Sequence, residues 1–350
     1  MRTGKVAITL FITVLLLFIC SRVSVHIEKD SIYKVDLPNE MRVAHFTNNS
    51  KKDFYKNIHV DKQKLPEVES NDVLVNVHAA SFTDRDFEFF NRVKGRKEFI
   101  PCSDFAGRVV AVGKNVRDYE VGDKVFGIAD LENKGGACAD YVAVPRNNIY
   151  PIPYSLTYKQ AAAIPSPALL NWLAFHQIDK KGFNKGVVLI DDAISEVGIM
   201  LTGLLVRNGF EVSGIDREQV KSWVEGFGVK NFYSYEKIDE HKKELEGKYD
   251  VVINLKHGMA IDDLLKFVKK GGTFISFEKM AVGKRDDVKI MVIDNAKITK
   301  DVFAKMARLV HLGKLKINVA KEFGLEHIRD AYMRSEKGNL DGKVIVNINE

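Results

Sequence analysis

Residues 191–198 are the part of the sequence best placed to bind an anion. They follow the apolar strand predicted for residues 186–190 and lead into a helix predicted near residues 196–208. The first backbone N–H groups of a helix have no partner within the helix and carry a partial positive charge. A phosphate group binds there when glycine lets the backbone approach it closely. The position of the segment therefore indicates a phosphate-binding turn. Gly198 is the one glycine within residues 191–198.

The side chains of this segment oppose the binding of an anion. Ser195 adds a Cβ atom and a hydroxyl group where the backbone would approach a phosphate, and Glu196, Asp191 and Asp192 bring up to three carboxyl groups toward it. Two unit charges about 4 Å apart repel by roughly 1 kcal/mol in water and by about 4 kcal/mol at an effective dielectric constant near 20. The alternative is that these carboxylates point to solvent and stabilise the helix N-terminus through its macrodipole.

A further acidic residue follows the next predicted strand, residues 211–215. Asp216 lies 18 positions after Gly198, near the offset at which a carboxylate accepts a hydrogen bond from an adenosine ribose 2′-OH. Arg217 beside it could cap an adenine ring or meet a 2′-phosphate. The alternative is that Asp216 caps the helix that follows it.

Two kinds of element position these residues. Short β-rich runs with Gly and Asp between them occur at residues 72–80, 107–113, 123–129 and 138–145. From residue 158, predicted strands at 186–190, 211–215, 249–255 and 271–277 alternate with helices near 158–176, 196–208, 217–226, 260–268 and 300–312. The first pattern predicts a compact β domain, and the second predicts a parallel, doubly wound sheet. The closing strand, residues 343–349, alternates like the first half, so we expect it to return to the β domain.

Length and composition agree with two folded domains. The chain has 350 residues, of which 45% are hydrophobic and 29% charged, so neither a disordered chain nor a fibre fits. Lys and Arg exceed Asp and Glu by 53 to 47, and three of these basic residues precede residue 23. This excess is too small for a nucleic-acid-binding face, and we expect no nucleic-acid partner.

The cysteines predict neither a disulfide framework nor a zinc site. Cys20, Cys102 and Cys138 are the three cysteines of the chain, and none belongs to a C-x-x-C pair. We therefore expect Cys102 and Cys138 to be small buried thiols.

The N-terminus predicts entry into the secretory pathway. Residues 6–20 form an unbroken apolar run after Arg2 and Lys5, which is typical of a signal peptide. Because no good cleavage site follows, residues 1–25 are either a signal peptide or a signal-anchor that tethers a lumenal or extracellular body to the membrane. The sequon at Asn48 would accept a glycan in a lumenal body.

Five segments in the right order resemble the zinc-independent branch of the medium-chain dehydrogenase/reductase superfamily, the quinone oxidoreductase or ζ-crystallin-like enzymes. They are PCSDFAGRVVAVG (101–113), VGDKVFG (121–127), GGACADYVAVP (135–145), AAAIP (161–165) and GKLKINVAKEFGLEHIRDAY (313–332) with GKVIV (342–346). The resemblance implies an α/β fold with two lobes. A GroES-like β-barrel lobe would span residues 31–150 and be completed by about 301–350, and a Rossmann lobe, residues 151–300, would bind NADPH or NADH.

Few residues of the family's site carry over. In the loop after the strand, Ala193, Val197 and Gly198 match the family pattern H-G-A-S-G-G-V-G. Thr83 and Asp86 stand where members carry N-P-x-D, and the resemblance gives them the role of placing the substrate. Leu170 replaces a Thr that members hold near the nicotinamide. Phe89, Phe90 and Trp172 could line an apolar cleft, although aromatic residues are more often part of the core.

Two functions stay open at this point. One is a zinc-independent NAD(P)H-dependent oxidoreductase with weakened turnover, whose small-molecule substrate is a quinone or an enone. The other is a degenerate homologue that serves as a binding or scaffold protein. If a dinucleotide binds, Asp216 favours NADH and the resemblance favours NADPH. The resemblance also implies a homodimer and no metal.

Overall fold

The computed structural model describes residues 36–46, 57–93, 98–179, 185–255, 258–277, 285–293, 300–313, 318–337 and 342–349. The chain divides into the units Met1–Leu37 and Pro38–Glu350, and the fold described below is that of the second unit. The predicted leader, Cys20 and Asn48 lie outside the described residues. No helix within the described ranges is both long enough and apolar enough to cross a membrane.

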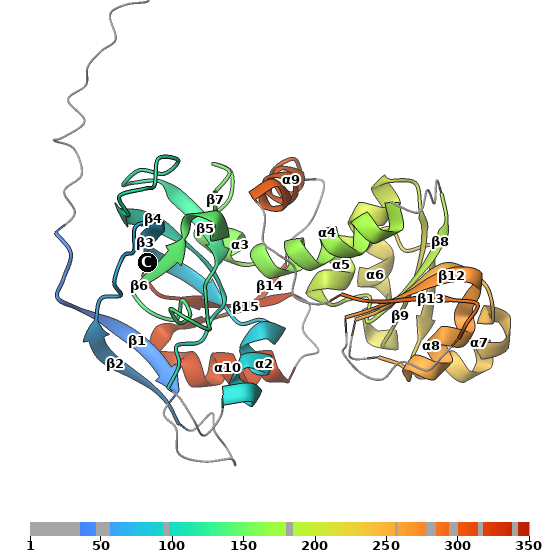
Figure 1. Cartoon of the computed structure of the whole chain (residues 1–350). Coiled ribbons are helices and arrows are strands. Elements are labelled where there is room, and N and C mark those ends of the chain that lie inside the picture. The colour runs from blue at the N-terminus through green and yellow to red at the C-terminus, as the bar shows by residue number, and fades with distance from the viewer. Residues whose placement is uncertain are drawn as a thin grey trace, which may run out of the picture. The chain divides into compact units, whose positions relative to one another are not determined.

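The β-rich lobe is a sheet of seven described strands in the order β14-β15-β3-β4-β5-β7, with β6 paired to β3 (Figure 1). Its strands are β3 (Asp72–Ser81), β4 (Asp104–Val112), β5 (Lys124–Ile128), β6 (Tyr141–Pro145), β7 (Ile149–Pro151), β14 (Val319–Gly324) and β15 (Lys343–Asn347). A separate hairpin joins β1 (Glu40–Phe46) to β2 (Ile58–Lys64). Helices α2 (Asp84–Val93) and α10 (Ile328–Glu336) and the short turns η2 (Arg146–Asn148) and η4 (Leu325–His327) complete the lobe.

The C-terminal strand belongs to this lobe. β15 lies antiparallel to β3, with Ile345 opposite Ser81, and parallel to β14. Its Val344 and Val346 side chains join the same buried cluster as Val75 and Phe105. The alternation in the closing segment therefore places its apolar side chains in the core of the first lobe.

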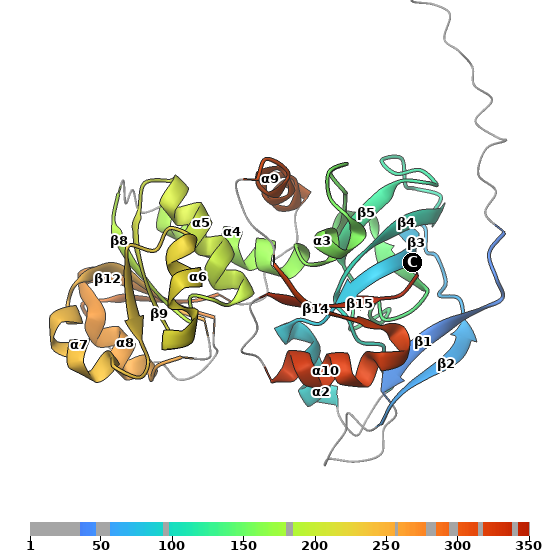
Figure 2. The same ribbon diagram turned by 180° about the vertical axis from the view of Figure 1, so that it is seen from behind.

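The second lobe is a parallel sheet of six described strands in the order β10-β9-β8-β11-β12-β13. The strands are β8 (Val187–Asp191), β9 (Glu211–Asp216), β10 (Asn231–Ser234), β11 (Tyr249–Asn254), β12 (Val268–Ser276) and β13 (Lys289–Val292). Its helices are α4 (Pro165–Asp179), α5 (Glu196–Arg207), η3 (Glu218–Val220), α6 (Lys221–Gly226), α7 (Ile238–Leu245) and α8 (Ile261–Phe267). Figure 2 shows β8, β9 and β12 of this sheet with helices α5 to α8 around them. Helix α3 (Tyr158–Ala162) packs against β3, β4 and β5 of the β-rich lobe, and α9 (Lys300–His311) packs against α4 and β7. This architecture confirms the two-lobed α/β fold.

Strand β8 shows why the sheet is covered on both faces. Val188 and Ile190 lie in a buried cluster with α5 and α6 residues, whereas Leu189 lies in a cluster with α7 and α8 residues. Successive side chains of a strand point to opposite faces, so a strand that is buried on both sides must be apolar at every position. The uninterrupted apolar run of β8 follows from this position.

The helix predicted at residues 158–176 is two helices. Thr157 caps α3 and forms a capping box with Gln160, and α4 begins at Pro165. Proline has no N–H group to donate within a helix, but at the first helical position that group would have no partner anyway. The two helices are therefore separated at Pro165, because proline is tolerated as the first residue of α4 but not within a continuous helix.

The expectation of two free thiols is wrong. Cys102 and Cys138 form a disulfide, with their Cα atoms 5.3 Å apart, and both side chains are fully buried. The segments that carry them run side by side, because Ala137 N donates to Cys102 O over 2.7 Å and Cys138 N donates to Pro101 O over 3.0 Å. A separation of 36 residues in the sequence hid this pairing.

Candidate functional site

The loop between β8 and α5 holds its shape through Ser195 and Gly198. Ser195 is the N-cap of α5, since its Oγ atom accepts a hydrogen bond from Gly198 N over 3.1 Å and donates one to Asp192 O over 2.8 Å. A Cβ atom on Gly198 would lie 2.7 Å from the carbonyl oxygens of Asp192 and Ala193. The serine side chain thus satisfies an N–H group at the helix N-terminus that a bound phosphate would otherwise meet.

Ala193 and Val197 are packing residues of this loop. Ala193 is 2% exposed and Val197 is 9% exposed, and both belong to the buried cluster between the sheet and α5. Leu170 packs against the same cluster from α4. The three side chains fix the position of the helix N-terminus relative to the sheet.

Asp216 ties this loop to β9. Its carboxylate oxygens accept hydrogen bonds from Ile194 N and Arg217 N, each over 2.8 Å, and the residue is 1% exposed. The Arg217 Nε atom lies 3.4 Å from the same carboxylate. Asp216 therefore caps the loop that precedes α5, whereas the turn η3 after it has no side-chain cap.

Asp191 and Asp192 add two more carboxyl groups at this edge of the sheet. The Asp191 carboxylate accepts from Tyr235 OH and from Met259 N, each over 3.0 Å, and it is fully buried. Burial, opposed by these hydrogen bonds and aided by the charge of Asp216, raises the pKa of Asp191 to about 7. Burial and the charges of Asp216 and Asp191 raise the pKa of Asp192 to about 8. Both groups therefore titrate near neutral pH.

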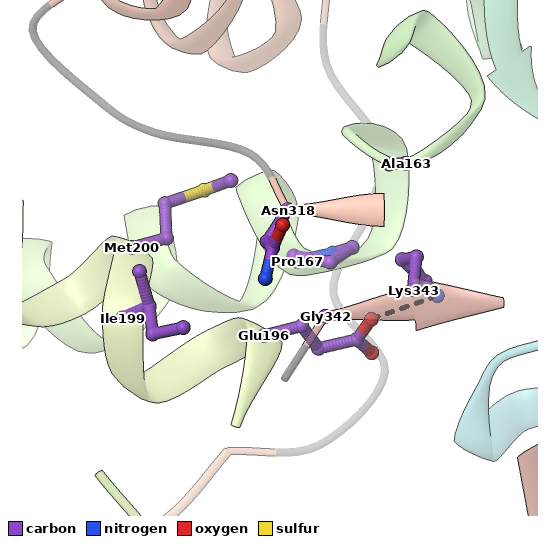
Figure 3. Close-up of a pocket in the computed structure, with 8 residues that line it drawn as sticks. All are labelled: Ala163, Pro167, Glu196, Ile199, Met200, Asn318, Gly342 and Lys343. Atoms are coloured by element: carbon purple, nitrogen blue, oxygen red, sulfur yellow. Dashed lines mark ion pairs between the residues drawn. The ribbon is translucent and has the colours of Figure 1, made fainter. Parts of the chain in front are cut away.

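Glu196 points to Lys343, and its side chain is 33% exposed. The Glu196 Oε2 atom lies 3.3 Å from Lys343 Nζ, and the two residues line a small pocket together with Ala163, Pro167, Ile199, Met200, Asn318 and Gly342 (Figure 3). The alternative in which the loop carboxylates face only solvent therefore does not describe Glu196, because its carboxylate is paired with a lysine. Burial, opposed by Lys343, raises the pKa of Glu196 to about 7.

Lys343 is a buried cation that the sequence analysis missed. It is 3% exposed, its Nζ atom donates to Phe82 O over 2.8 Å, and Asp104 Oδ2 lies 3.7 Å away. Burial lowers the pKa of Lys343, but the charges of Glu196 and Asp104 outweigh this effect and raise it. A lysine at the start of the apolar segment GKVIV was the signal that could have revealed it.

Asp104 connects this cation to α4. Its carboxylate accepts from Ser166 N over 2.9 Å and from Ser166 Oγ over 2.5 Å, at the first turn of the helix. Burial raises the pKa of Asp104 to about 6, although Lys343 and Ser166 oppose the shift. A buried carboxylate held in this way fixes the start of α4 close to Lys343.

Thr83 and Asp86 are brought together, but as the cap of α2. Asp86 Oδ2 accepts from Thr83 N over 2.8 Å and from Ser103 N and Oγ over 3.1 and 2.9 Å. Asp86 is 1% exposed and Thr83 is 4% exposed, and Asp86 Oδ1 has no hydrogen-bond partner among the described residues. Burial raises the pKa of Asp86. The geometry accounts for both side chains as helix and loop anchors, and a role in placing a substrate remains a prediction.

The aromatic residues proposed for a cleft lie in or against the core. Phe89 and Phe90 are 7% and 6% exposed and pack in the β-rich lobe with Phe46 and Phe99. Trp172 packs against the cluster around α4 and α9, and Lys305 Nζ lies 4.3 Å from the centre of its ring.

Comparison with known proteins agrees with this arrangement. Residues 69–154 match the family described as alcohol dehydrogenase GroES-like domain, and residues 227–346 match the one described as zinc-binding dehydrogenase. A 2-methylene-furan-3-one reductase of Solanum lycopersicum is 26% identical over 328 residues, covering 89% of this chain and 80% of that enzyme. The chain belongs to the medium-chain dehydrogenase/reductase superfamily.

Within this superfamily the chain is quinone oxidoreductase-like. The quinone oxidoreductase of Sus scrofa is 29% identical over 235 residues, covering 65% of this chain and 68% of that enzyme. The structure of the quinone oxidoreductase from Coxiella burnetii shares the fold, with a TM-score of 0.81 at 23% identity, covering 89% of this chain and 100% of that one. The family recognised from the sequence segments is thereby confirmed.

The residues at the loop do not fit the phosphate groups of a dinucleotide in the arrangement described. Ser195 caps the helix N-terminus, and the Glu196 carboxylate already lies beside Lys343. In the described parts of the chain no three His, Cys, Asp or Glu side chains are arranged to hold a metal. That the protein works without zinc stays a prediction.

Proposed function

We propose that this protein is an NAD(P)H-dependent oxidoreductase of low cofactor affinity that reduces a quinone or an enone. Membership of the superfamily supports the reaction type, because relatives named as a quinone oxidoreductase and an NADPH-dependent alkenal/one oxidoreductase align over 65% and 81% of the chain. The low affinity is the contribution of this chain's own residues. The homodimer and the acceptor itself remain expectations from the resemblance.

The observation that carries the low affinity is the chemistry of the β8–α5 turn. The turn keeps the strand and the helix N-terminus of a dinucleotide-binding turn, and Gly198 packs closely against the loop's own carbonyl oxygens. Around it lie Asp191, Asp192, Asp216 and Glu196, and burial raises the pKa of three of these groups. Burial favours the neutral form of these carboxyl groups, and each one that is ionised repels a dinucleotide anion.

A second candidate is a protein that binds a partner without catalysis. The specific observation in its favour is the cap on the helix N-terminus, where the Ser195 hydroxyl takes the N–H group of Gly198. Asp216, which is 1% exposed and bonded to the loop, also offers no exposed carboxylate to a ribose. If this second candidate is right, the two lobes serve only as a scaffold that binds a partner.

Titration of the protein with NADPH and with NADH, followed by the fluorescence of the reduced nicotinamide, separates the two candidates. The oxidoreductase predicts saturable binding with a dissociation constant between micromolar and millimolar, together with oxidation of the cofactor when a quinone or an enone is added. Binding in the low micromolar range removes the scaffold candidate. No binding at millimolar concentrations removes the oxidoreductase.

A further inference from the structure

Glu196 lies both at the N-terminus of a helix and beside a buried cation. It is the first residue of α5, directly after the N-cap Ser195, so its side chain starts at the positive end of the helix. The carboxylate extends to Lys343, which comes from the last strand of the chain (Figure 3). A dinucleotide phosphate would be stabilised by the same two features, a helix N-terminus and a nearby cation.

We propose that Glu196 is an internal competitor for the phosphate of a dinucleotide, and that the two anions compete for Lys343 beside the N-terminus of α5. The inference rests on the proposed function and names the residue that limits its cofactor affinity. A phosphate can enter only when the Glu196 carboxylate leaves Lys343 or takes up a proton.

The carboxyl groups around Lys343 differ in their freedom to leave it. Asp104 is fully buried and held by two hydrogen bonds from Ser166, and Asp86 is held by Thr83 and Ser103. The Glu196 side chain is 33% exposed, and within the described residues Lys343 is its ion-pair partner. Glu196 is therefore the carboxylate of this cluster that can move toward solvent without breaking hydrogen bonds to the backbone.

The competition depends on pH because Glu196 titrates near neutral pH. Burial is the main cause that raises the pKa of Glu196 to about 7. Among the charged groups that face it, Lys343 on β15 lowers the pKa, and Asp84 on α2 and Asp104 on β4 raise it. As the pH falls from 8 to 6.5, Glu196 takes up a proton and ceases to compete for Lys343, so the affinity for an anion rises.

The test compares Glu196→Gln with Glu225→Gln. Glutamine keeps the size of the side chain and removes its charge, and the control removes the same charge from an exposed residue of α6 on the same lobe. The probe is NADH, whose pyrophosphate stays fully ionised between pH 6.5 and 8. At pH 8 we expect Glu196→Gln to lower the NADH dissociation constant about fivefold or more, because a repulsive contact is removed, and Glu225→Gln to change it less than twofold.

The pH profile gives a readout that a merely structural role would not change. The parent protein should bind NADH more tightly at pH 6.5 than at pH 8, and the dependence should be smaller in Glu196→Gln. The double variant Glu196→Gln, Lys343→Gln should lose the gain in affinity. If it does not fold, the comparison of Glu196→Gln with Glu225→Gln still decides.

Two results would overturn the inference. If Glu196→Gln binds NADH no more tightly than the parent, Glu196 is not the competitor, and the proposed function stands. If neither protein binds NADH at millimolar concentrations, both the inference and the proposed function fail.

Discussion

The Asp216 carboxylate accepts a hydrogen bond from the backbone N–H of Ile194 over 2.8 Å and thereby fastens the β8–α5 loop to the neighbouring strand. Replacing Asp216 with Ala should leave Ile194 N without its partner in a buried site. We expect a loss of about 1–3 kcal/mol in the free energy of unfolding, measured with urea at pH 6, where the nearby carboxyl groups hold protons. Asp286→Asn, an exposed acid, is the control. Equal stability of both variants would show that the hydrogen bond does not hold the loop.

The double variant Ser195→Gly, Glu196→Gly should bind NADPH and NADH more tightly than the parent. Glycine at 195 frees the helix N-terminus and lets the backbone approach a phosphate, and loss of Glu196 removes a repulsive contact of about 1 to 4 kcal/mol, so we expect a gain of roughly fivefold to several hundredfold. The gain should be smaller at high salt because exposed charges are screened. Fluorescence titration measures it. Ser195→Gly alone separates the steric part, and unchanged affinity in a folded double variant would mean that another defect limits binding.

Stability should fall as the pH rises from about 5 to 8. Asp104, Asp191, Asp192 and Glu196 have folded-state pKa values raised to about 6, 7, 8 and 7, above those of an unfolded chain. The folded protein therefore holds more protons in this window, and each such group contributes a slope of up to about 1.4 kcal/mol per pH unit. Urea unfolding at pH 5.5, 6.5 and 7.5 checks the sign. A stability that rises with pH over this range would contradict the burial of these carboxyl groups.

Removal of the disulfide should destabilise the protein. Cys102→Ala with Cys138→Ala opens a loop of 36 residues, for which the entropy of the unfolded chain predicts a loss of about 2–4 kcal/mol. Urea unfolding of the double variant measures the loss, and a reductant added to the parent should reproduce it. Cys20→Ser should have no such effect. If the parent unfolds identically with and without reductant, the bond does not contribute to stability.

The disulfide also supports the proposal that the body enters the secretory pathway, either released after cleavage near residues 21–25 or tethered by residues 6–25. Disulfides persist in oxidising compartments and are rare in the cytosol. When the protein is expressed with its own leader in a glycosylating eukaryotic cell, we expect a glycosidase-sensitive mass shift that Asn48→Gln abolishes. Full-length protein in the cytosol, with its leader retained, would refute the proposal.

The sequence predicted the sheet of the second lobe well, because strands buried on both faces must be apolar throughout. The strand predicted at residues 186–190 is β8 shifted by one residue, and the helix predicted near 196–208 is α5 within one residue. β10 and α7 were missed, since their short segments are half-exposed and polar. The hydrophobic pattern of a sequence predicts a helix or strand least well where the element is neither clearly buried nor clearly capped.

The site was predicted only in part, because its residues meet through tertiary contacts. The acidic character of the loop was evident from Asp191, Asp192 and Glu196 in the sequence. The direction of Glu196 was not, because its partner Lys343 lies far from it in the sequence, on β15. The pairing of Cys102 with Cys138 was hidden for the same reason. The residue types show that the loop is acidic. The spacing of residues along the sequence does not show which basic side chain lies beside each acidic one in the folded protein.

The position of Lys343 also bears on the order in which the molecule can become stable during synthesis. Lys343 is made after both Asp104 and Glu196, the carboxylates that it balances. At about 5–20 residues per second, the ribosome needs roughly 7 to 30 s to pass from Glu196 to Lys343. During that interval β3 also lacks β15 beside it. The ion pairs of Lys343 and the pairing of β15 with β3 can therefore form only after this segment has been made. A stop codon just before Gly342 should leave the β-rich lobe without β15, and Asp104 and Glu196 without their cation.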